Sequence, residues 1–257
     1  MAVDSPPYNL KLAKRSHSAG RVPPTRRAFT LMEVMIAVSI IAVVSVLLVT
    51  WTRATRESAA KVRCIYNLSQ LGNLTFIYAN DHGGRMLYYH YDRDAKYERW
   101  WRTELTSKGY LKDEKIAYCP SLVAPNPQTV QSYGMRLYNP KADNPEGYDN
   151  KNINKGELVT TYVHFSRISR PSTYPFYADS VQSLDYSVAT RAGKQWHRFS
   201  INPAATNGGG IHLRHNGRAN VWFADGHVES LDAKGLGQVG ILSAYNEKIE
   251  PIALPQP

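Results

Sequence analysis

Residues 29–52 read FTLMEVMIAVSIIAVVSVLLVTWT and contain one charged residue, Glu33. A helix over this stretch spans about 36 Å at 1.5 Å per residue, which exceeds the roughly 30 Å hydrocarbon core of a bilayer. The stretch has no proline, is longer than the apolar segment of a secretory signal, and is not closely followed by a small-residue cleavage site. It therefore predicts a single membrane-spanning helix.

The charges around this stretch predict its orientation. The 257-residue chain carries 31 Lys and Arg against 21 Asp and Glu, a formal net charge of +10. Half of this excess lies in residues 1–28, where Asp4 is the one acidic residue and the basic residues are Lys11, Lys14, Arg15, Arg21, Arg26 and Arg27. Basic flanks stay on the cytoplasmic side. We therefore expect a cytoplasmic leader and an exported chain after Arg53, and interpret the basicity largely as a targeting signal.

Composition excludes several other classes of protein. Hydrophobic residues make up 43% of the chain and charged residues 20%, which is ordinary for a globular protein and excludes wholesale disorder. Two cysteines are too few for a cysteine-dense secreted scaffold or a four-thiolate zinc site.

Glu33 points to a specific use of the apolar helix. A carboxylate costs about 2.5–3.5 kcal/mol at mid-bilayer and less near an interface, so it is normally paired or functional. Cleavage before Phe29 would create an α-amino cation that could pair with Glu33 of a neighbouring subunit. Residues 26–33, RRAFTLME, resemble the prepilin processing site of type IV pilins and type II secretion pseudopilins. The resemblance implies that a prepilin peptidase cuts between Ala28 and Phe29 and methylates the new amine; the family's usual residue before the cut is glycine.

The pattern after the membrane stretch predicts a longer helix. Apolar residues recur every three positions, which indicates a stripe suited to packing on a globular head: Val62, Ile65, Leu68, Leu71, Leu74 and Ile77. Asn80 to Gly84 form a helix stop. We predict an α+β fold, as the pilin resemblance also implies. Its parts are a leader over 1–28, a helix over 29–80 that is transmembrane over 29–52, and an antiparallel β-sheet head over 81–257.

Residues 215–231, HNGRANVWFADGHVESL, predict a tight hairpin. Two β-prone runs, 219–224 and 227–231, flank Asp225-Gly226, a dipeptide that accepts the positive φ angles of a type I′ turn. Strands are also expected over 160–165 and 174–178, and a polar surface excursion over 121–156.

His215 followed by nine residues and Asp225-Gly226 is similar to the H-x9-DG signature of a prepilin-type, processing-associated family. The similarity extends in scattered blocks that begin at Cys64, near Cys119 and at Arg170. The similarity implies that the chain is a membrane-anchored pilin-like protein. The family is named after its motif, and this name implies no demonstrated activity.

The histidines in this region allow two interpretations. Imidazole and carboxylate are ordinary metal ligands, so a metal site could be built from His212, His215, Asp225 and His227. We favour the structural interpretation, in which Asp225 makes the turn and His215 hydrogen-bonds across the hairpin base. We expect no cofactor. A structural Ca²⁺, which some related pseudopilins bind, stays open but is not placed by the available carboxylates Asp81, Asp92, Asp94, Asp179 and Asp185.

Cys64 and Cys119 would both lie outside the cytoplasm, where a disulfide can form. Joining them would stabilise the head by roughly 4 kcal/mol through loop-closure entropy, and we favour this pairing over two buried free thiols.

Function is expected to be structural. No nucleophile elbow or paired carboxylates indicate an enzyme. The charge of +5 on residues 29–257 is explained by a solvated surface without a nucleic acid partner. The expected partners are the prepilin peptidase, other pilin-like subunits and the inner membrane. The sequence does not distinguish a type II secretion pseudopilin from a type IV pilin. The alternatives are a monomeric anchored binding protein and a head-borne metalloenzyme.

Overall fold

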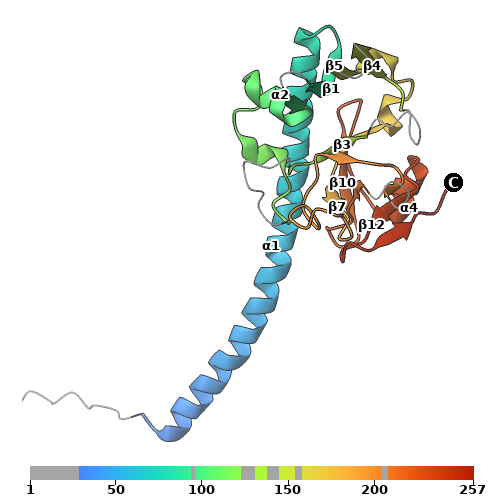
Figure 1. Ribbon diagram of the computed structural model, residues 1–257. Helices are drawn as coiled ribbons and strands as arrows, with labels where there is room; N and C mark the ends of the chain where they lie inside the picture. Colours follow the sequence, from blue (N-terminus) through green and yellow to red (C-terminus); the bar gives the residue numbers. More distant parts are fainter. Residues whose placement is uncertain (1–28, 94–95, 123–130, 138–144, 154–157, 204–207) are drawn as a thin grey trace, which may run out of the picture. The chain divides into compact units, whose positions relative to one another are not determined.

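The computed structural model describes residues 29–93, 96–122, 131–137, 145–153, 158–203 and 208–257 (Figure 1). The chain divides into two units between Val49 and Thr50, and each is considered by itself. The first described element, α1 (Leu31–Asp81), begins in the first unit and ends in the second. Its bounds are close to the predicted helix over 29–80.

The N-terminal unit is the apolar part of α1. Leu31–Leu48 form a candidate membrane span with a mean hydropathy of 2.7, and none of these residues is buried. The span therefore has the length and composition to cross a membrane, as expected from the sequence.

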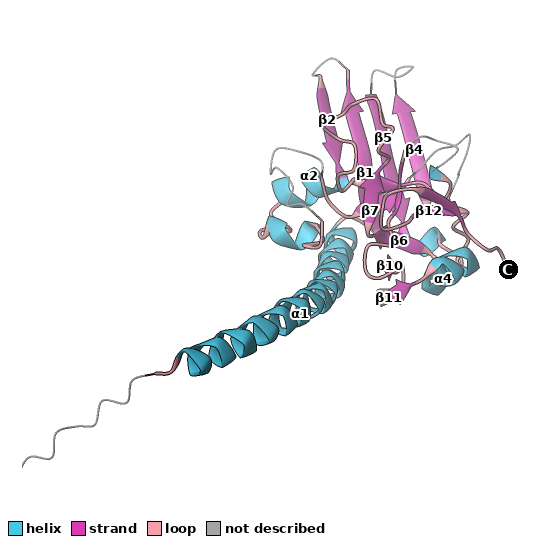
Figure 2. Ribbon diagram, turned by 90° about the horizontal axis from the view of Figure 1, so that it is seen from below, coloured by secondary structure: helices cyan, strands magenta, loops and turns pink. Residues whose placement is uncertain are grey.

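The second unit contains two main sheets. A four-stranded antiparallel sheet has the order β2-β1-β5-β4, and Figure 2 shows these strands side by side. A five-stranded sheet has the order β11-β10-β6-β3-β8, in which β3 and β8 pair in parallel. The α+β prediction is confirmed, with the difference that one sheet is mixed. The strands of these sheets are β1 (Arg85–Asp92), β2 (Tyr97–Trp100), β3 (Gly134–Arg136), β4 (Tyr148–Ile153), β5 (Leu158–His164), β6 (Pro175–Ala178), β8 (Arg198–Phe199), β10 (Ala219–Phe223) and β11 (Val228–Leu231).

Smaller elements complete this unit. Two further antiparallel pairs are formed by β7 (Ser180–Gln182) with β9 (Gly209–Ile211) and by β12 (Ser243–Tyr245) with β13 (Pro251–Ala253). The short helices are α2 (Trp101–Ser107), η1 (Glu114–Ala117), η3 (Phe165–Arg167), η4 (Pro171–Thr173) and α4 (Ala233–Gln238).

The end of α1 follows the sequence prediction, and its buried face follows it in part. The amide of Gly84 donates to the Ala79 carbonyl at 2.7 Å, and Gly84 has a φ of +76°, which suits a helix stop that glycine favours. Within the predicted stripe, Val62 is 66% and Ile77 53% exposed. A three-residue step falls about 60° short of a full turn, so such a stripe rotates off the face. The middle of the stripe is confirmed, because Leu68 and Leu71 are fully buried, and the buried face also includes Cys64, Thr75 and Tyr78.

Strand β10 separates two hydrophobic clusters. Trp222 packs in the cluster that includes the buried face of α1, whereas Val221 and Phe223 pack in the cluster with Ile211 and Leu236. Successive side chains along this strand therefore point to opposite clusters. The polar segment 121–156, however, is not only a surface excursion, because β3 lies inside the five-stranded sheet.

The hairpin of β10 and β11 has a different turn from the predicted one. Trp222 pairs with Val228, and the Phe223 amide donates to the His227 carbonyl at 2.9 Å, so the loop has three residues. Gly226 has a φ of +103°, whereas Asp225 is not among the positive-φ residues. A type I′ turn needs positive φ at both central positions. The type I′ prediction is therefore wrong, and glycine at the third loop position allows the longer turn.

Candidate functional site: a buried Cys-Cys-Asp-His cluster

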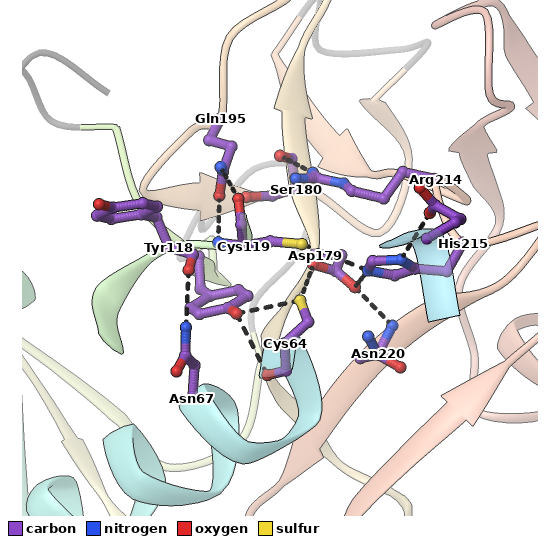
Figure 3. Close-up of polar contacts among 12 residues, drawn as sticks. Cys64, Asn67, Tyr118, Cys119, Asp179, Ser180, Gln195, Arg214, His215 and Asn220 are labelled. Atoms are coloured by element: carbon purple, nitrogen blue, oxygen red, sulfur yellow. Dashed lines mark hydrogen bonds and ion pairs between the residues drawn. The ribbon is translucent and has the colours of Figure 1, made fainter. Parts of the chain in front are cut away.

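Four reactive side chains from distant parts of the sequence meet inside the second unit (Figure 3). They are Cys64 on α1, Cys119 after η1, Asp179 between β6 and β7, and His215 in the turn before β10. All four are buried, and their sulfur, oxygen and nitrogen atoms lie within 4.8 Å of one another.

The contacts inside the cluster join every member to another. The Cys64 thiol donates to Asp179 Oδ1 at 3.1 Å. Nε2 of His215 lies 3.3 Å from Asp179 Oδ2 and 3.4 Å from the Cys119 sulfur. Asp179 therefore lies between the thiol on the helix and the imidazole on the sheet side.

Surrounding groups hold these side chains in place. Gln195, which is buried, accepts from the Cys119 amide at 2.9 Å and donates to the Cys119 carbonyl at 2.7 Å. The Tyr133 hydroxyl lies 3.0 Å from the Cys64 sulfur and donates to the Cys64 carbonyl at 3.2 Å. The backbone amide of Asn220, at the start of β10, donates to Asp179 Oδ2 at 2.8 Å. Each of these contacts fixes a cluster residue through a buried partner.

The carboxylate and the imidazole form a buried ion pair. Burial would raise the pKa of Asp179, but the hydrogen bond from His215 and the charge of Arg214 hold it well below its usual value. Burial opposes the charged form of His215, yet its hydrogen bond to Asp179 outweighs this effect and raises its pKa to about 10. Arg214 is itself buried and donates to the Ser180 carbonyl. The pair is thus charged at neutral pH.

The two cysteines differ in acidity. Burial, the hydrogen bond with Cys119 and the charge of Asp179 raise the pKa of Cys64 well above its usual value. Burial also opposes ionisation of Cys119, but hydrogen bonds from Cys64 and His215 more than offset it and lower its pKa to about 6. Cys119 is therefore the sulfur that ionises first, with a thiol and an imidazolium as its donors.

The four residues that the sequence offers as metal ligands, His212, His215, Asp225 and His227, do not lie together in the structure. His227 Nδ1 lies 2.6 Å from Asp225 Oδ1 on a partly exposed turn, whereas His215 lies in the cluster. The His212 side chain is buried, and its backbone amide donates to the Asp179 carbonyl at 2.9 Å. Asp225 does belong to the turn, as predicted: its carboxylate accepts from the His227 amide at 3.2 Å.

The predicted role of the His215 side chain is wrong. The backbone of His215 bonds that of Arg218, with N to O distances of 3.0 and 3.2 Å, so this part of the turn does not need the imidazole. The imidazole instead points to Asp179 and Cys119 (Figure 3).

Both cysteines are free and buried in the structure, although their sulfur atoms lie within 4.8 Å of each other. The expected disulfide is thus not formed here, and each sulfur has a polar partner in the cluster. That the pair can be oxidised stays a prediction.

Asp179 was only one of five candidate carboxylates for Ca²⁺ in the sequence. Of the others, Asp81 accepts from the Tyr110 hydroxyl at 2.7 Å, and Asp94 lies outside the described residues. Reasoning from the sequence did not place Asp179 with the cysteines, because no local spacing connects them.

The predicted processing site lies at the start of α1. Ala28 is outside the described residues, and Phe29 is 84% exposed. Glu33 Oε2 accepts from the amide and the hydroxyl of Thr30, both at 2.9 Å, and the Thr30 hydroxyl accepts from the Glu33 amide at 3.2 Å. This reciprocal pair is a capping box, so the carboxylate that the resemblance assigns to assembly also starts the helix.

Comparison with known proteins identifies the N-terminal segment. Residues 24–49 match the prokaryotic N-terminal methylation motif, the signature of type IV pilins and pseudopilins. The chain therefore carries the N-terminal signature of a pilin-like precursor, which together with the apolar helix indicates a membrane-anchored protein. No curated protein and no solved structure matches the chain.

Proposed function

We propose that this chain is a structural, non-enzymatic subunit of a type IV pilus or a type II secretion-type filament. It inserts in the inner membrane with the leader in the cytoplasm, and the prepilin peptidase cuts between Ala28 and Phe29 and methylates the new amine. The observation that carries the proposal is the methylation motif over residues 24–49 on a helix whose described residues from Leu31 to Leu48 are all unburied.

The apolar helix would serve in two environments. Before assembly its side chains face lipid, and afterwards they face the same helices of neighbouring subunits, so loss of lipid contacts is offset by close helix packing. The head would remain on the periplasmic or extracellular side.

Glu33 would set the axial position of each subunit. Among the described residues, Thr30 alone bonds the Glu33 carboxylate, through Oε2. Its other oxygen can accept from the methylated amine of a neighbour's Phe29. Such a pair between a carboxylate and an ammonium, in a surrounding of low dielectric, is strong enough to select one register over its neighbours.

The first test is the N-terminal mass of the membrane-extracted protein from cells with and without the prepilin peptidase. We expect a peptide that begins at N-methyl-Phe29 in the presence of the peptidase and an intact leader in its absence. An intact leader under both conditions would refute the proposal and favour the alternative, a monomeric anchored protein whose head binds an extracellular ligand.

The second test separates helix capping from subunit pairing. Glu33→Leu removes both roles, whereas Thr30→Ala removes the capping hydroxyl and keeps the charge. We expect both variants to be inserted and cleaved, Glu33→Leu to be lost from sheared filament fractions, and Thr30→Ala to be retained. Equal loss of the two variants would show that capping alone explains the effect, and normal incorporation of Glu33→Leu would refute the pairing role.

A further inference from the structure

We propose that the buried cluster is a structural zinc site, in which one Zn²⁺ is bound by Cys64, Cys119, Asp179 and His215. The inference rests on the second unit alone and does not depend on filament assembly. Three independent features support it: the distances between the ligand atoms, their chemical types, and the partners behind them.

The distances suit a tetrahedral ion. Zinc lies about 2.3 Å from thiolate sulfur and about 2.0–2.2 Å from imidazole nitrogen or carboxylate oxygen, so neighbouring ligands of a tetrahedral site are roughly 3.3–3.8 Å apart. The Cys119 sulfur lies 3.4 Å from His215 Nε2, and Nε2 lies 3.3 Å from Asp179 Oδ2. Cys64 Sγ lies 3.1 Å from Asp179 Oδ1, and all the ligand atoms are within 4.8 Å. Ligand atoms at the 4.8 Å limit have to approach by about 1 Å, and those already in contact by a few tenths of an ångström.

The types of ligand select zinc over the hard cations. Two sulfurs with one imidazole and one carboxylate suit a borderline-soft ion, whereas Ca²⁺ and Mg²⁺ require mainly oxygen ligands. Four protein ligands complete a tetrahedral shell and leave no position for water, which is typical of structural sites. The cluster thus differs from the Ca²⁺ site considered from the sequence.

The partners behind the ligands are those that metal sites use. Nδ1 of His215, on the far side of the ring from the cluster, lies 3.5 Å from Glu57 Oε1 without a hydrogen bond. A small approach would give the carboxylate–histidine arrangement that orients a metal-binding imidazole. The Tyr133 hydroxyl lies 3.0 Å from the Cys64 sulfur, and the Asn220 amide donates to the Asp179 carboxylate at 2.8 Å. These groups would stabilise the negative charge of the ligands.

Charge and proton balance are consistent with binding. Two thiolates and one carboxylate around Zn²⁺ have a net charge of −1, and the buried Arg214 beside the cluster offsets it (Figure 3). Binding releases the protons that the two sulfurs still carry and the proton on His215 Nε2, because each ligand coordinates in its deprotonated form. A pocket lined in part by Glu57, Lys61 and His215 reaches the outer side of the imidazole, where Nδ1 faces Glu57.

Zinc would join α1 to three separate segments of the head. Without it, the site has to bury an ion pair and two thiols in one place, and burying such groups is costly unless they are fully paired. The ion would also protect both sulfurs from oxidation outside the cytoplasm, because a coordinated thiolate is less available to form a disulfide.

The test is a cobalt titration of the full chain in detergent, after reduction and removal of metal with a chelator. We expect one Co²⁺ per chain, with a thiolate-to-cobalt charge-transfer band and the strong visible absorption of tetrahedral Co²⁺, and displacement by one equivalent of Zn²⁺. Zinc should also slow alkylation of both cysteines in the unaltered protein, a readout that needs no variant. Absence of the thiolate band in reduced, folded protein would overturn the proposal, and so would a cysteine alkylation rate that zinc leaves unchanged.

Variants identify the ligands. Cys119→Ser and His215→Gln should abolish the tetrahedral spectrum, and Glu57→Gln should weaken binding by about 10–100-fold. His227→Gln is the matched control, because this histidine also faces a carboxylate but lies on the exposed turn. A spectrum retained in Cys119→Ser and His215→Gln, or lost in a folded His227→Gln, would overturn the assignment.

Discussion

Gly72→Ala tests whether α1 packs on β10 as the structure has it. Gly72 lies on the buried face of the helix, and a Cβ atom added there would be 2.1 Å from Nε1 and 2.2 Å from Cε2 of Trp222. Real Cβ contacts are never so short, so the indole must move. Trp222 is fully buried, its Nε1 donates to the Gly226 carbonyl at 3.1 Å, and its ring lies 5.0 Å from that of Phe76.

Three effects determine the change in the free energy of unfolding. Alanine has the higher helix propensity, which favours the variant by about 1 kcal/mol. Overpacking a tight core costs about 1–3 kcal/mol, and an indole N–H that loses its buried acceptor costs about 1–3 kcal/mol more. The net effect is destabilisation by about 1–5 kcal/mol, although propensity alone predicts the opposite sign.

Chemical unfolding of the full chain in detergent, followed by tryptophan fluorescence and near-UV circular dichroism, measures this difference. Asn73→Ala is the matched control, because its neighbouring side chain is exposed and its substitution should change stability by less than about 0.5 kcal/mol. In a Trp222→Phe background the added cost of Gly72→Ala should fall, because the smaller ring vacates part of the space. A Gly72→Ala variant as stable as the unaltered chain would refute this packing.

Three further substitutions test other contacts by the same unfolding assay. Asp179→Asn should destabilise the metal-free protein by about 3–5 kcal/mol, because it leaves buried positive charge without its partner, whereas Asp225→Asn on the exposed turn should cost less than about 1 kcal/mol. Equal effects would contradict the buried ion pair. Gly226→Ala should cost about 1–3 kcal/mol, because its φ is +103°; a neutral result would exclude this turn. Gly237→Ala, in α4, should destabilise despite better helix propensity, because its Cβ would lie 1.8 Å from the Pro255 carbonyl oxygen. A stabilised variant would show that this contact is absent.

The parts of the fold that depend on local chemistry could be predicted from the sequence. The apolar run, the stop at Asn80 to Gly84 and the β-prone runs around Asp225-Gly226 each have a local physical cause, and the corresponding elements are present. The buried face of α1 was harder to predict. Its fully buried positions include Cys64 and Thr75, which a hydrophobic pattern does not select.

The cluster could not be predicted because its members are distant in sequence. The compartment argument predicts a disulfide between Cys64 and Cys119, whereas the structure has two free thiols within 4.8 Å of each other. A disulfide needs only two residues and gives no reason to add others. Asp179 follows the short strand β6, and its position depends on the pairing of β6 with β10. Hydrogen bonding of the Asn220 amide to the Asp179 carboxylate is a result of that pairing, and no spacing along the chain indicates it.

The nine-residue spacing in the H-x9-DG pattern has a physical explanation in the contacts of β10 with α1. The pattern places His215 before the strand and Gly226 after it, and contacts occur at both ends and between them: His215 with Glu57, Trp222 with Gly72, and Gly226 with Phe76, whose ring lies 3.1 Å from a Cβ added at Gly226. Residues further along β10 contact residues further along α1, so the strand and the helix run side by side in the same direction. A shorter or longer spacing would move either the imidazole out of the cluster or the turn off Phe76. The motif is therefore explained as the strand that docks the head onto its own N-terminal helix, with the proposed zinc site at one end of the contact.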